Sequence, residues 1–350
     1  MTVTGVEATD GGSRRLVDSA VTIRDVARLA EVSTATVSRV MNQTGRVDPA
    51  LASRVRIAAA QLDYRPSSVA RNLRLQQTAV WLLMISDIEN PFFTLVARGV
   101  EDVANRLGFS VVLCNTDESA EKETRYIHVA LQEQAAGVII SPASRETDVS
   151  LLVSRGVPVV ALDRPVKDHE VDRVLTDSRQ GAREATVHLF EQGWQRVACI
   201  TGPAETTTAE ERACGYREAV KEVGARFRPL VAYSDFRTSG GGVAAGRLLD
   251  ARRPPDAFFV ANNLMALGVL DELRRRDLRP GRDVGIVSFD DPPWARLLDP
   301  PLSCVAQPSY DIGVQAATML AERLSGEPHV RAKVDTLSPT LIVRKSSLRE

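Results

Sequence analysis

The hydrophobic and polar positions follow two different patterns, and the change between them comes at about residue 78. Before that point, apolar residues recur at helical spacing in three short stretches, 22–30, 33–41 and 48–63, which predict helices. After it, short apolar runs alternate with amphipathic stretches, a pattern typical of parallel sheets with helices on both faces. The chain therefore predicts a small helical module followed by a much larger α/β body.

The α/β body contains enough apolar runs of strand length for two open sheets. Buried strands are predicted at 79–85, 109–115, 137–141, 158–162, 196–202, 229–233, 256–261 and 283–289. Helices are predicted at 92–107, 119–135, 147–155, 178–192, 209–224, 239–251 and 263–276. Ligands bind at the carboxyl edges of such sheets, so polar residues directly after these strands are candidates for a site.

The three helices of the first module carry their own start signals. Thr22 with Asp25 three residues later predicts a capping box, and Ser33 can cap the second helix. Asp48 followed by Pro49 is typical of a third helix start. The candidate core residues are Ile23, Val26, Ala27, Ala30, Val32, Val37, Val40, Val55, Ile57 and Leu62. These features predict a miniature three-helix domain.

The second helix of the module, within VSTATVSRVMN (32–42), has an unusual polar face. Val37, Val40 and Met41 form one narrow apolar stripe. The opposite side carries Thr34, Ala35, Ser38, Arg39 and Asn42. Two helices joined by a tight turn, the second with a face of small polar residues, are typical of a helix-turn-helix.

The residue types around this face suit double-stranded DNA. The hydroxyls of Ser33, Thr36 and Ser38 can donate to phosphate oxygens without reading the sequence. The Arg39 guanidinium can bond bidentately to a guanine edge, and the methyl groups in the first turn can contact thymine. A small bundle whose polar face is merely solvated remains the alternative.

The net charge of −1 hides a division along the chain. Residues 21–76 hold nine arginines and no lysine against four acidic residues, which gives +5, whereas residues 77–350 carry −5. A basic module joined to an acidic body indicates a polyanionic partner for one end only. A solvated basic face would give the same count.

Several functional classes find no support in the residues. The four cysteines and four histidines are scattered, so we expect neither a disulfide framework nor a metal site, and no cofactor. No GxGxxG, GxxxxGK(S/T) or GxSxG follows a predicted strand, so we do not expect an enzyme. No apolar run is long enough to cross a membrane, and residues 1–20 lack the apolar core of a secretory signal. We expect a disordered leader on a cytoplasmic, nucleoid-associated protein.

The first module also resembles a known family. Its runs TVSRVMN (36–42) and YRPSSVARNL (64–73) are similar to the DNA-binding headpiece of the lactose/galactose repressor (LacI/GalR) family of bacterial regulators. The resemblance implies that Thr34 and Ala35 set base preference and that Arg39 is the shared base contact. The DNA-binding residues it implies in this module are Thr22, Ser33, Thr34, Ala35, Thr36, Ser38, Arg39, Asn42, Arg46 and Tyr64.

One residue departs from the family pattern in the turn between the first two helices. Glu31 stands where the family usually has glycine. A residue other than glycine with positive φ costs on the order of 1 kcal/mol. We therefore expect a slightly less stable or differently shaped turn.

Residues 66–75, PSSVARNLRL, have helical spacing but are shorter than the roughly 12 residues that an isolated helix needs. We expect them to become helical only on a partner. The resemblance implies a hinge helix that forms on the operator, pairs with its dimer mate and inserts Leu73 into the minor groove. Ser67 and Ala70 match further hinge contacts. A plain linker with a stray leucine is the alternative.

The resemblance continues across the body, which looks like the periplasmic sugar-binding-protein fold, with two doubly wound α/β lobes joined by three crossovers. The landmarks are DIENPFF (87–93), ALDRP (161–165), TGPAETTTAEERACGY (201–216), FVANNLMALG (259–268) and SFDD (288–291). The predicted parts are the leader 1–20, the helix-turn-helix domain 21–65, the hinge 66–77 and the core 78–350, with one lobe at about 78–176 and 307–336 and the other at about 177–306 and 337–350.

The cleft between the lobes is the predicted effector site. Sugars are bound by charged planar groups that meet hydroxyl pairs and by aromatic rings that cover the apolar ring face. The effector-binding candidates, which match family contact positions, are Phe92, Phe93, Asp163, Arg212, Phe236, Asn262 and Asp290, with Arg164 and Asp235 as weaker candidates. Any one of them can instead be a helix cap or a core residue. Asn263 replaces the family's usual Asp and can still cap the following helix.

These observations predict a sequence-specific transcriptional regulator, a repressor, that binds a near-palindromic operator in double-stranded DNA. The leucine heptads that some members append for tetramerisation are absent after Leu341, so we expect a homodimer. The expected effector is a carbohydrate, a sugar or sugar derivative. Two alternatives stay open: the same regulator with a purine or a phosphoprotein co-effector, and a ligand-binding receptor or enzyme of similar fold without a DNA role.

Overall fold

The structure is a computed structural model that describes residues 21–41, 46–64, 78–167, 171–225, 227–326 and 331–349. The chain divides into two compact units, Met1–Leu75 and Gln76–Glu350. Four predicted DNA contacts lie outside the described residues, as does the leader 1–20; they are Asn42, Ser67, Ala70 and Leu73.

The first unit is built from three helices, α1 (Ile23–Ala30), α2 (Thr34–Met41) and α3 (Pro49–Gln61). Each begins at the predicted signal, because a side-chain oxygen accepts a main-chain N–H of the first turn or closes a capping box. The cap contacts are Thr22 N to Asp25 Oδ2 at 3.0 Å, Thr36 N to Ser33 Oγ at 3.1 Å, and Ala50 N and Leu51 N to Asp48 Oδ1 at 2.9 and 3.2 Å. The predicted helix starts are confirmed.

The three helices enclose one small core. Its buried residues are Val26, Ala27, Ala30, Val37, Val40, Val55, Ala58 and Ala59. Ile57 was predicted to join them, but it is 55% exposed, so that prediction is wrong. Val55, Ala58 and Ala59 are spaced three and four residues apart and share the inward face of α3, which turns Ile57 outward.

In the turn between α1 and α2, Glu31 has a positive φ of 52°, a conformation that favours glycine. Arg54 of α3 supports this turn from the side. Its Nη2 donates to the main-chain oxygen of Ala30 at 2.6 Å and to Glu31 Oε2 at 3.1 Å. Arg54 thereby satisfies a carbonyl at the end of α1 that has no intrahelical partner.

The described residues of the second unit form two six-stranded sheets. The first, in the order β11-β5-β4-β3-β1-β2, consists of β1 (Val80–Ile85), β2 (Ser110–Asn115), β3 (Gly137–Ile140), β4 (Val159–Leu162), β5 (Asp172–Thr176) and β11 (Val334–Leu337). The second, in the order β12-β10-β9-β8-β6-β7, consists of β6 (Val197–Thr201), β7 (Leu230–Tyr233), β8 (Ala257–Val260), β9 (Gly285–Phe289), β10 (Ser303–Ala306) and β12 (Thr340–Ile342).

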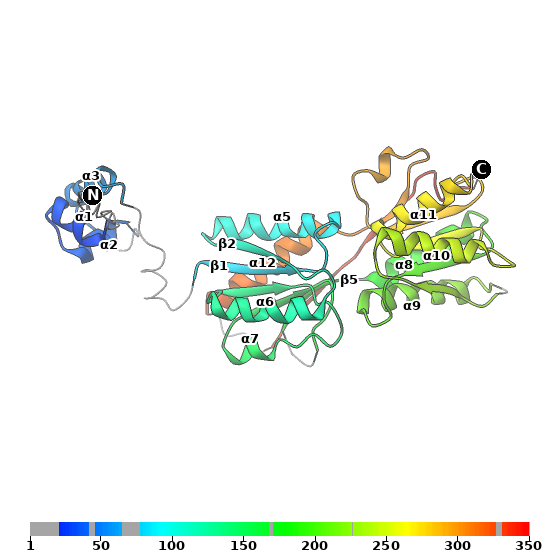
Figure 1. Cartoon of the computed structure of the whole chain (residues 1–350), viewed down its shortest axis with the longest axis horizontal. Helices are drawn as coiled ribbons and strands as arrows, with labels where there is room; N and C mark the ends of the chain where they lie inside the picture. The colour runs from blue at the N-terminus through cyan, green and yellow to red at the C-terminus, as the bar shows by residue number, and fades with distance from the viewer. Residues whose placement is uncertain are drawn as a thin grey trace, which may run out of the picture. The chain divides into compact units, whose positions relative to one another are not determined.

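Helices cover both faces of each sheet, so each sheet with its helices makes one lobe (Figure 1). The first lobe has α5 (Pro91–Arg106), α6 (Ala120–Gln132), α7 (Ser150–Ser154) and α12 (Ser309–Leu324). The second has α8 (Ser178–Glu191), α9 (Thr207–Glu222), α10 (Thr238–Leu249), α11 (Asn263–Arg275) and a 3₁₀ turn at Ala295–Leu297. Within the described ranges, no helix is both long and apolar enough to span a membrane.

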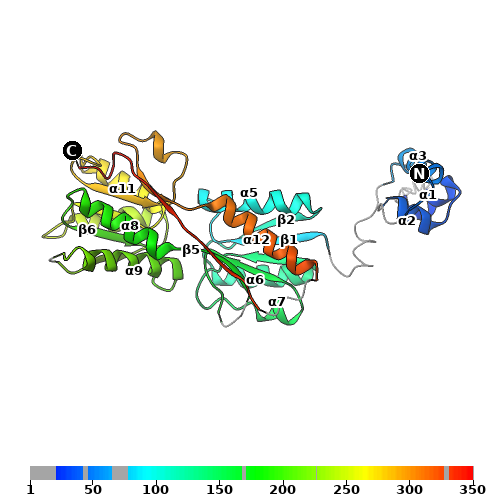
Figure 2. The same ribbon diagram turned by 180° about the vertical axis from the view of Figure 1, so that it is seen from behind.

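The chain passes between the lobes three times, and Figure 2 shows these segments side by side. The crossovers lie between β5 and α8, between β10 and α12, and between β11 and β12. Because both sheets end at these crossovers, the carboxyl ends of the central strands face the space between the lobes.

The structure corrects the predicted sheets in two ways. It has four strands that were not predicted, β5, β10, β11 and β12, which are three to five residues long and mix polar with apolar positions. In addition, β12 pairs antiparallel with β10, whereas wholly parallel sheets were expected. Strands this short contain only a few apolar residues, so their hydrophobic signal in the sequence is weak.

One helix was also not predicted. The inward face of α12 combines the small residues Gly313, Ala316 and Ala317 with the larger Ile312, Met319 and Leu320. These small residues let α12 approach α5 closely, because a Cβ on Gly313 would lie 2.1 Å from the main-chain oxygen of Val96. Close packing of backbones therefore replaces large side chains at this contact.

Candidate functional site

The polar face of α2 is open to solvent. Its exposed residues are Ser33, Thr34, Ala35 and Arg39, with Thr36 and Ser38 half-buried. Val37 and Val40 on the opposite side are buried in the small core and hold the helix in place. The helix therefore presents a guanidinium and several small side chains outward from a fixed support.

Three more predicted DNA contacts lie in the described part of this unit. Thr22 is exposed, and its hydroxyl donates to Asp25 Oδ2 at 2.6 Å, which lowers the pKa of Asp25. Arg46 is exposed. Tyr64 packs partly against the core, and burial raises the pKa of its phenol. Contact of these residues with DNA stays a prediction.

In the second unit, the seven predicted effector residues line one cleft between the lobes. Phe92 and Phe93 lie in the first turn of α5, and Arg212 lies on α9. The remaining four follow strand ends and are Asp163 after β4, Phe236 after β7, Asn262 after β8 and Asp290 after β9. All seven side chains are buried. The weaker candidates Arg164 and Asp235 also line this cleft.

Three of these residues have left-handed backbone conformations. The φ angles are 63° at Asp163, 62° at Phe236 and 69° at Asp290. Such angles are costly for residues with a Cβ and persist where the surrounding structure enforces them. Each occurs where the chain leaves the carboxyl end of a strand, and each side chain lines the cleft.

Arg164 is held by acidic groups of its own lobe. Its Nη1 and Nη2 donate to the two Glu118 carboxylate oxygens at 2.7 and 2.8 Å, and Nη1 also donates to the main-chain oxygen of Pro142 at 3.0 Å. Burial alone lowers the pKa of Arg164, but the Glu118 carboxylate raises it above its usual range. The charge is therefore fully paired before any ligand enters.

Arg212 lies on the other side of the cleft. Its Nη1 donates to the main-chain oxygen of Ala261 at 2.6 Å, and its guanidinium carbon lies 3.8 Å from the centre of the Phe289 ring. Burial lowers the pKa of Arg212, and the carboxylates of Asp290 and Asp163 oppose that shift. Burial also raises the pKa of Asp163.

Both oxygens of Asp290 are held by amides. Gln307 Nε2 donates to Oδ1 at 2.7 Å and Asn263 Nδ2 donates to Oδ2 at 2.9 Å. Asn262, by contrast, caps α11, because its Oδ1 accepts Met265 N at 2.8 Å. The expectation that Asn263 caps this helix is therefore wrong. The cap needs an extended residue before the helix, and only Asn262 has that conformation.

Polar contacts cross from one lobe to the other around the cleft. They are Asn263 Nδ2 to Asn90 Oδ1 at 2.7 Å, Arg164 Nε to Thr208 Oγ1 at 3.3 Å, and Arg237 Nη2 to Asp117 Oδ1 at 2.8 Å. The free cavity inside is about 30 Å³, room for roughly two water molecules. The lobes are therefore closed on each other. Among the described residues, no group of three or more His, Cys, Asp or Glu side chains could hold a metal ion.

Comparison with known proteins adds to this geometry. Residues 22–67 match the family described as bacterial regulatory proteins, lacI family, and residues 186–347 match the periplasmic binding protein-like domain. The ribose operon repressor of Halalkalibacterium halodurans is 39% identical over 307 residues, which cover 88% of this chain and 91% of that protein. The chain belongs to the lacI family of bacterial regulatory proteins.

Solved structures support the same assignment for this LacI-family chain. The complex of the transcriptional regulator CelR with cellobiose is 33% identical, with a TM-score of 0.71 over 93% of this chain and 99% of that one. The lac repressor dimer bound to operator and an anti-inducer is 26% identical, with a TM-score of 0.83 over 94% of this chain and 100% of that one. The chain is a DNA-binding transcriptional repressor with a small-molecule effector.

The structure brings residues to the cleft of this LacI-family chain that sequence reasoning missed. They are Asp87, Asn90, Glu118, Thr208, Arg237 and Gln307. Asp87 and Asn90 lie within the landmark DIENPFF, so the motif itself could have indicated them. Gln307 directly follows β10, which was not predicted, and Glu118 reaches the cleft through a loop after β2. Neither carries a local signal.

Proposed function

We propose that this LacI-family repressor binds a near-palindromic operator as a homodimer and that ribose, an unphosphorylated pentose, is the effector that changes its affinity for DNA. The cleft is the observation that carries the proposal. Phe92 and Phe93 from one lobe and Phe236 from the other supply apolar ring faces, and charged planar groups lie among them. This combination matches a polyhydroxylated ring with an apolar face.

The charges of the cleft favour a neutral ligand. Its described lining contains five carboxylates against three guanidiniums. Arg164 is paired with Glu118, and Arg237 with Asp117. A phosphate group entering this cleft would meet more carboxyl groups than guanidiniums, and two of the three guanidiniums are already paired. Sugar phosphates and nucleotides are therefore poor candidates.

The volume of the cavity decides how far the cleft must open for a ligand. Pockets that hold drug-sized ligands measure about 300–1,000 Å³, whereas this cavity holds about 30 Å³. The side chains must move apart even for a monosaccharide, and a disaccharide requires still more. The relative with 39% identity is named a ribose operon repressor, which agrees with a pentose.

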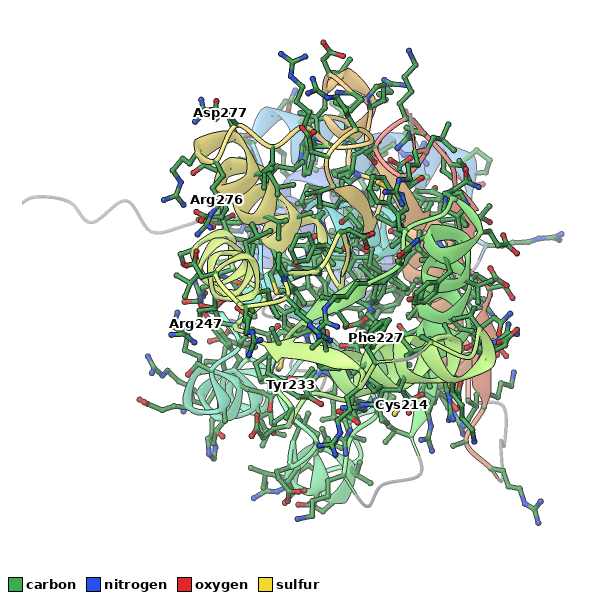
Figure 3. All side chains as sticks on the ribbon, turned by 90° about the vertical axis from the view of Figure 1, so that its right-hand side faces the viewer. Cys214, Phe227, Tyr233, Arg247, Arg276 and Asp277 are labelled. Carbon is green, nitrogen blue, oxygen red and sulfur yellow. The ribbon has the colours of Figure 1, made fainter. Side chains whose placement is uncertain are left out.

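Two edge strands offer the surface for a homodimer. On the edge strand β2, Leu113 is 41% exposed and lines a groove of about 510 Å³. Val112 on the same strand and Leu95 on α5 are each 46% exposed. In the second lobe, the edge strand β7 ends in Tyr233 (Figure 3). Tyr233 is 43% exposed, and Val243 on α10 is 54% exposed. A second copy of the chain would cover these apolar edges.

In this proposal α2 reads the DNA and the body does no chemistry. Arg39, Thr34 and Ala35 contact base edges, and Ser33 and Arg46 contact phosphates. The effector is bound and released unchanged, so the protein is a regulator without catalytic activity. We place it in the cytoplasm, with the DNA that it controls.

Two measurements test the proposal. Calorimetric titration of the full-length protein with ribose, ribose 5-phosphate, cellobiose and adenosine should give the tightest binding for ribose. An operator selected from randomised DNA duplexes should then show a change in affinity when ribose is added, measured by fluorescence anisotropy. Preference for a phosphorylated or larger ligand would overturn the ribose assignment, and an unchanged operator affinity would overturn its regulatory role.

A further inference from the structure

Asn263, the first residue of α11, is completely buried between the two lobes. Its Nδ2 lies 2.7 Å from Asn90 Oδ1 in the first lobe and 2.9 Å from Asp290 Oδ2 in the second. Both neighbours are acceptors, because the Asn90 oxygen also accepts the main-chain N–H of Phe92 at 3.0 Å and Asp290 presents a carboxylate. Asn263 can therefore face them only with its NH₂ group.

The other half of the Asn263 amide supports this assignment. Its Oδ1 is buried and has no hydrogen-bond partner among the described residues. A buried acceptor without a partner costs free energy, so the residue is useful here through its two donors. In the arrangement of this chain, the family's usual aspartate would place a second carboxylate against Asp290, and an apolar residue would leave two acceptors without their donor.

We propose that Asn263 is a positioning residue of the effector site, an inference that rests on the effector binding between the lobes. Asn263 holds Oδ2 of Asp290, while Gln307 holds Oδ1. The same NH₂ group reaches Asn90, which begins the helix that carries Phe92. Closing the lobes and orienting the Asp290 carboxylate are therefore one event, because a single amide makes both contacts.

Two substitutions separate the donor role from simple packing. Asn263→Asp keeps the shape but removes both donors and adds a carboxylate beside Asp290. Asn263→Ala removes the group altogether. Gln132→Glu makes the same amide-to-carboxylate change at an exposed position on α6 and serves as the control.

The readout is the ribose dissociation constant of each full-length variant relative to wild type, measured by calorimetry at pH 7.5 and pH 5. At pH 7.5 both Asn263 variants should bind about 10- to 100-fold more weakly, the loss expected for a buried hydrogen bond to a charged group. At pH 5, Asn263→Asp should regain at least about fivefold relative to wild type, because two adjacent carboxyl groups share one proton and restore an O–H donor. Asn263→Ala should regain nothing.

The charges that surround Asp290 are the same in every variant, so they cancel in the ratio to wild type. They include Arg212 on α9 and Asp163 after β4, and the Cys304 thiol on β10 also lies near Asp290. A wild-type affinity for Asn263→Asp at pH 7.5 would overturn the proposal. So would an equal, pH-independent loss in both Asn263 variants, since that result needs only packing.

A second measurement tests this inference independently of the choice of ribose as effector. If wild type does not bind ribose, the effector assignment fails. The role of Asn263 is then tested by thermal unfolding of the ligand-free wild type and variants. The destabilisation of Asn263→Asp should then shrink as the pH falls from 7.5 to 5, while that of Asn263→Ala stays constant. A destabilisation of Asn263→Asp that does not change with pH would contradict the placement of its side chain against Asp290.

Discussion

The polar face of α2 and the cleft of the body both carry arginine, but they hold it in opposite ways. On α2, Arg39 is exposed beside small hydroxyls. In the cleft, Arg212 is only 4% exposed, and it bonds to the main-chain oxygen of Ala261 and stacks on Phe289. The Arg39 guanidinium is exposed to solvent, whereas the Arg212 guanidinium already bonds to groups of the protein interior.

The difference follows from what each surface must bind. DNA phosphates are negatively charged and hold counterions, so an exposed guanidinium binds them favourably because the counterions are released. A small neutral molecule brings neither, so its hydroxyls must exchange hydrogen bonds with groups that are held in place. Exposed polar groups therefore suit the macromolecular partner, and buried paired groups suit the small one.

The largest loss of affinity should come from removing Arg212, which is buried in the cleft. Arg212→Ala removes a buried hydrogen bond to the main-chain oxygen of Ala261 and the positive charge that acts on Asp290 and Asp163. A buried charged group that loses its partners costs about 3 kcal/mol. Calorimetry should show ribose affinity falling by roughly 100-fold or more, while operator affinity without ribose stays at the wild-type value. Lys221→Ala, at an exposed position on the same helix, should change neither. An intact response to ribose would remove Arg212 from the site.

An intermediate effect is expected for the exposed Arg39 on α2. Arg39→Ala should cost about 1–3 kcal/mol for each headpiece that reads a guanine, because a bidentate base contact is lost. Competition binding with operator and scrambled duplexes measures this as lost discrimination. Arg39→Lys keeps the charge and should retain most non-specific affinity but not the specificity. Ribose binding should be unaffected in both, and unchanged discrimination would show that α2 does not read bases through Arg39.

The smallest loss of affinity is expected for an ion pair that lies at the cleft but is exposed to solvent. Arg237 and Asp117 pair across the cleft, but their side chains are 48% and 38% exposed. An exposed pair contributes about 0.2–1 kcal/mol, so Arg237→Ala should weaken ribose binding only two- to fivefold, and 1 M salt should remove the difference. Asp117→Ala alone and together with Arg237→Ala completes a double-mutant cycle. A large, salt-independent loss would mean that Arg237 touches the effector directly.

Local signals predicted much of this architecture. The caps at Thr22, Ser33 and Asp48 are local, because each concerns three or four consecutive residues, and they appeared as expected. The central strands are buried on both faces, so their apolar runs were unambiguous. The cleft residues could be proposed because parallel strands deliver their carboxyl ends to one place and because the chain resembles a family whose motifs it shares.

The features that the sequence did not predict depend on contacts between segments far apart in the chain. Glu118 matters because it meets Arg164, 46 residues away, and no pattern near either residue indicates that meeting. Ile57 lies in an alanine-rich helix whose inward side cannot be read from spacing alone. The roles of Asn262 and Asn263 were exchanged for a similar reason. Which amide caps the helix depends on one residue's backbone angle, whereas the bond from Asn263 to Asn90 spans 173 residues.

The closed cavity of about 30 Å³ has a consequence for the timing of the response. A sugar cannot enter so small a space, so association must wait until the lobes part. The observed rate of binding should then rise with ribose concentration only until it reaches the rate of opening, and level off there. The interlobe contacts would in that case limit how quickly the repressor can respond to a sudden supply of sugar, whatever its affinity at equilibrium.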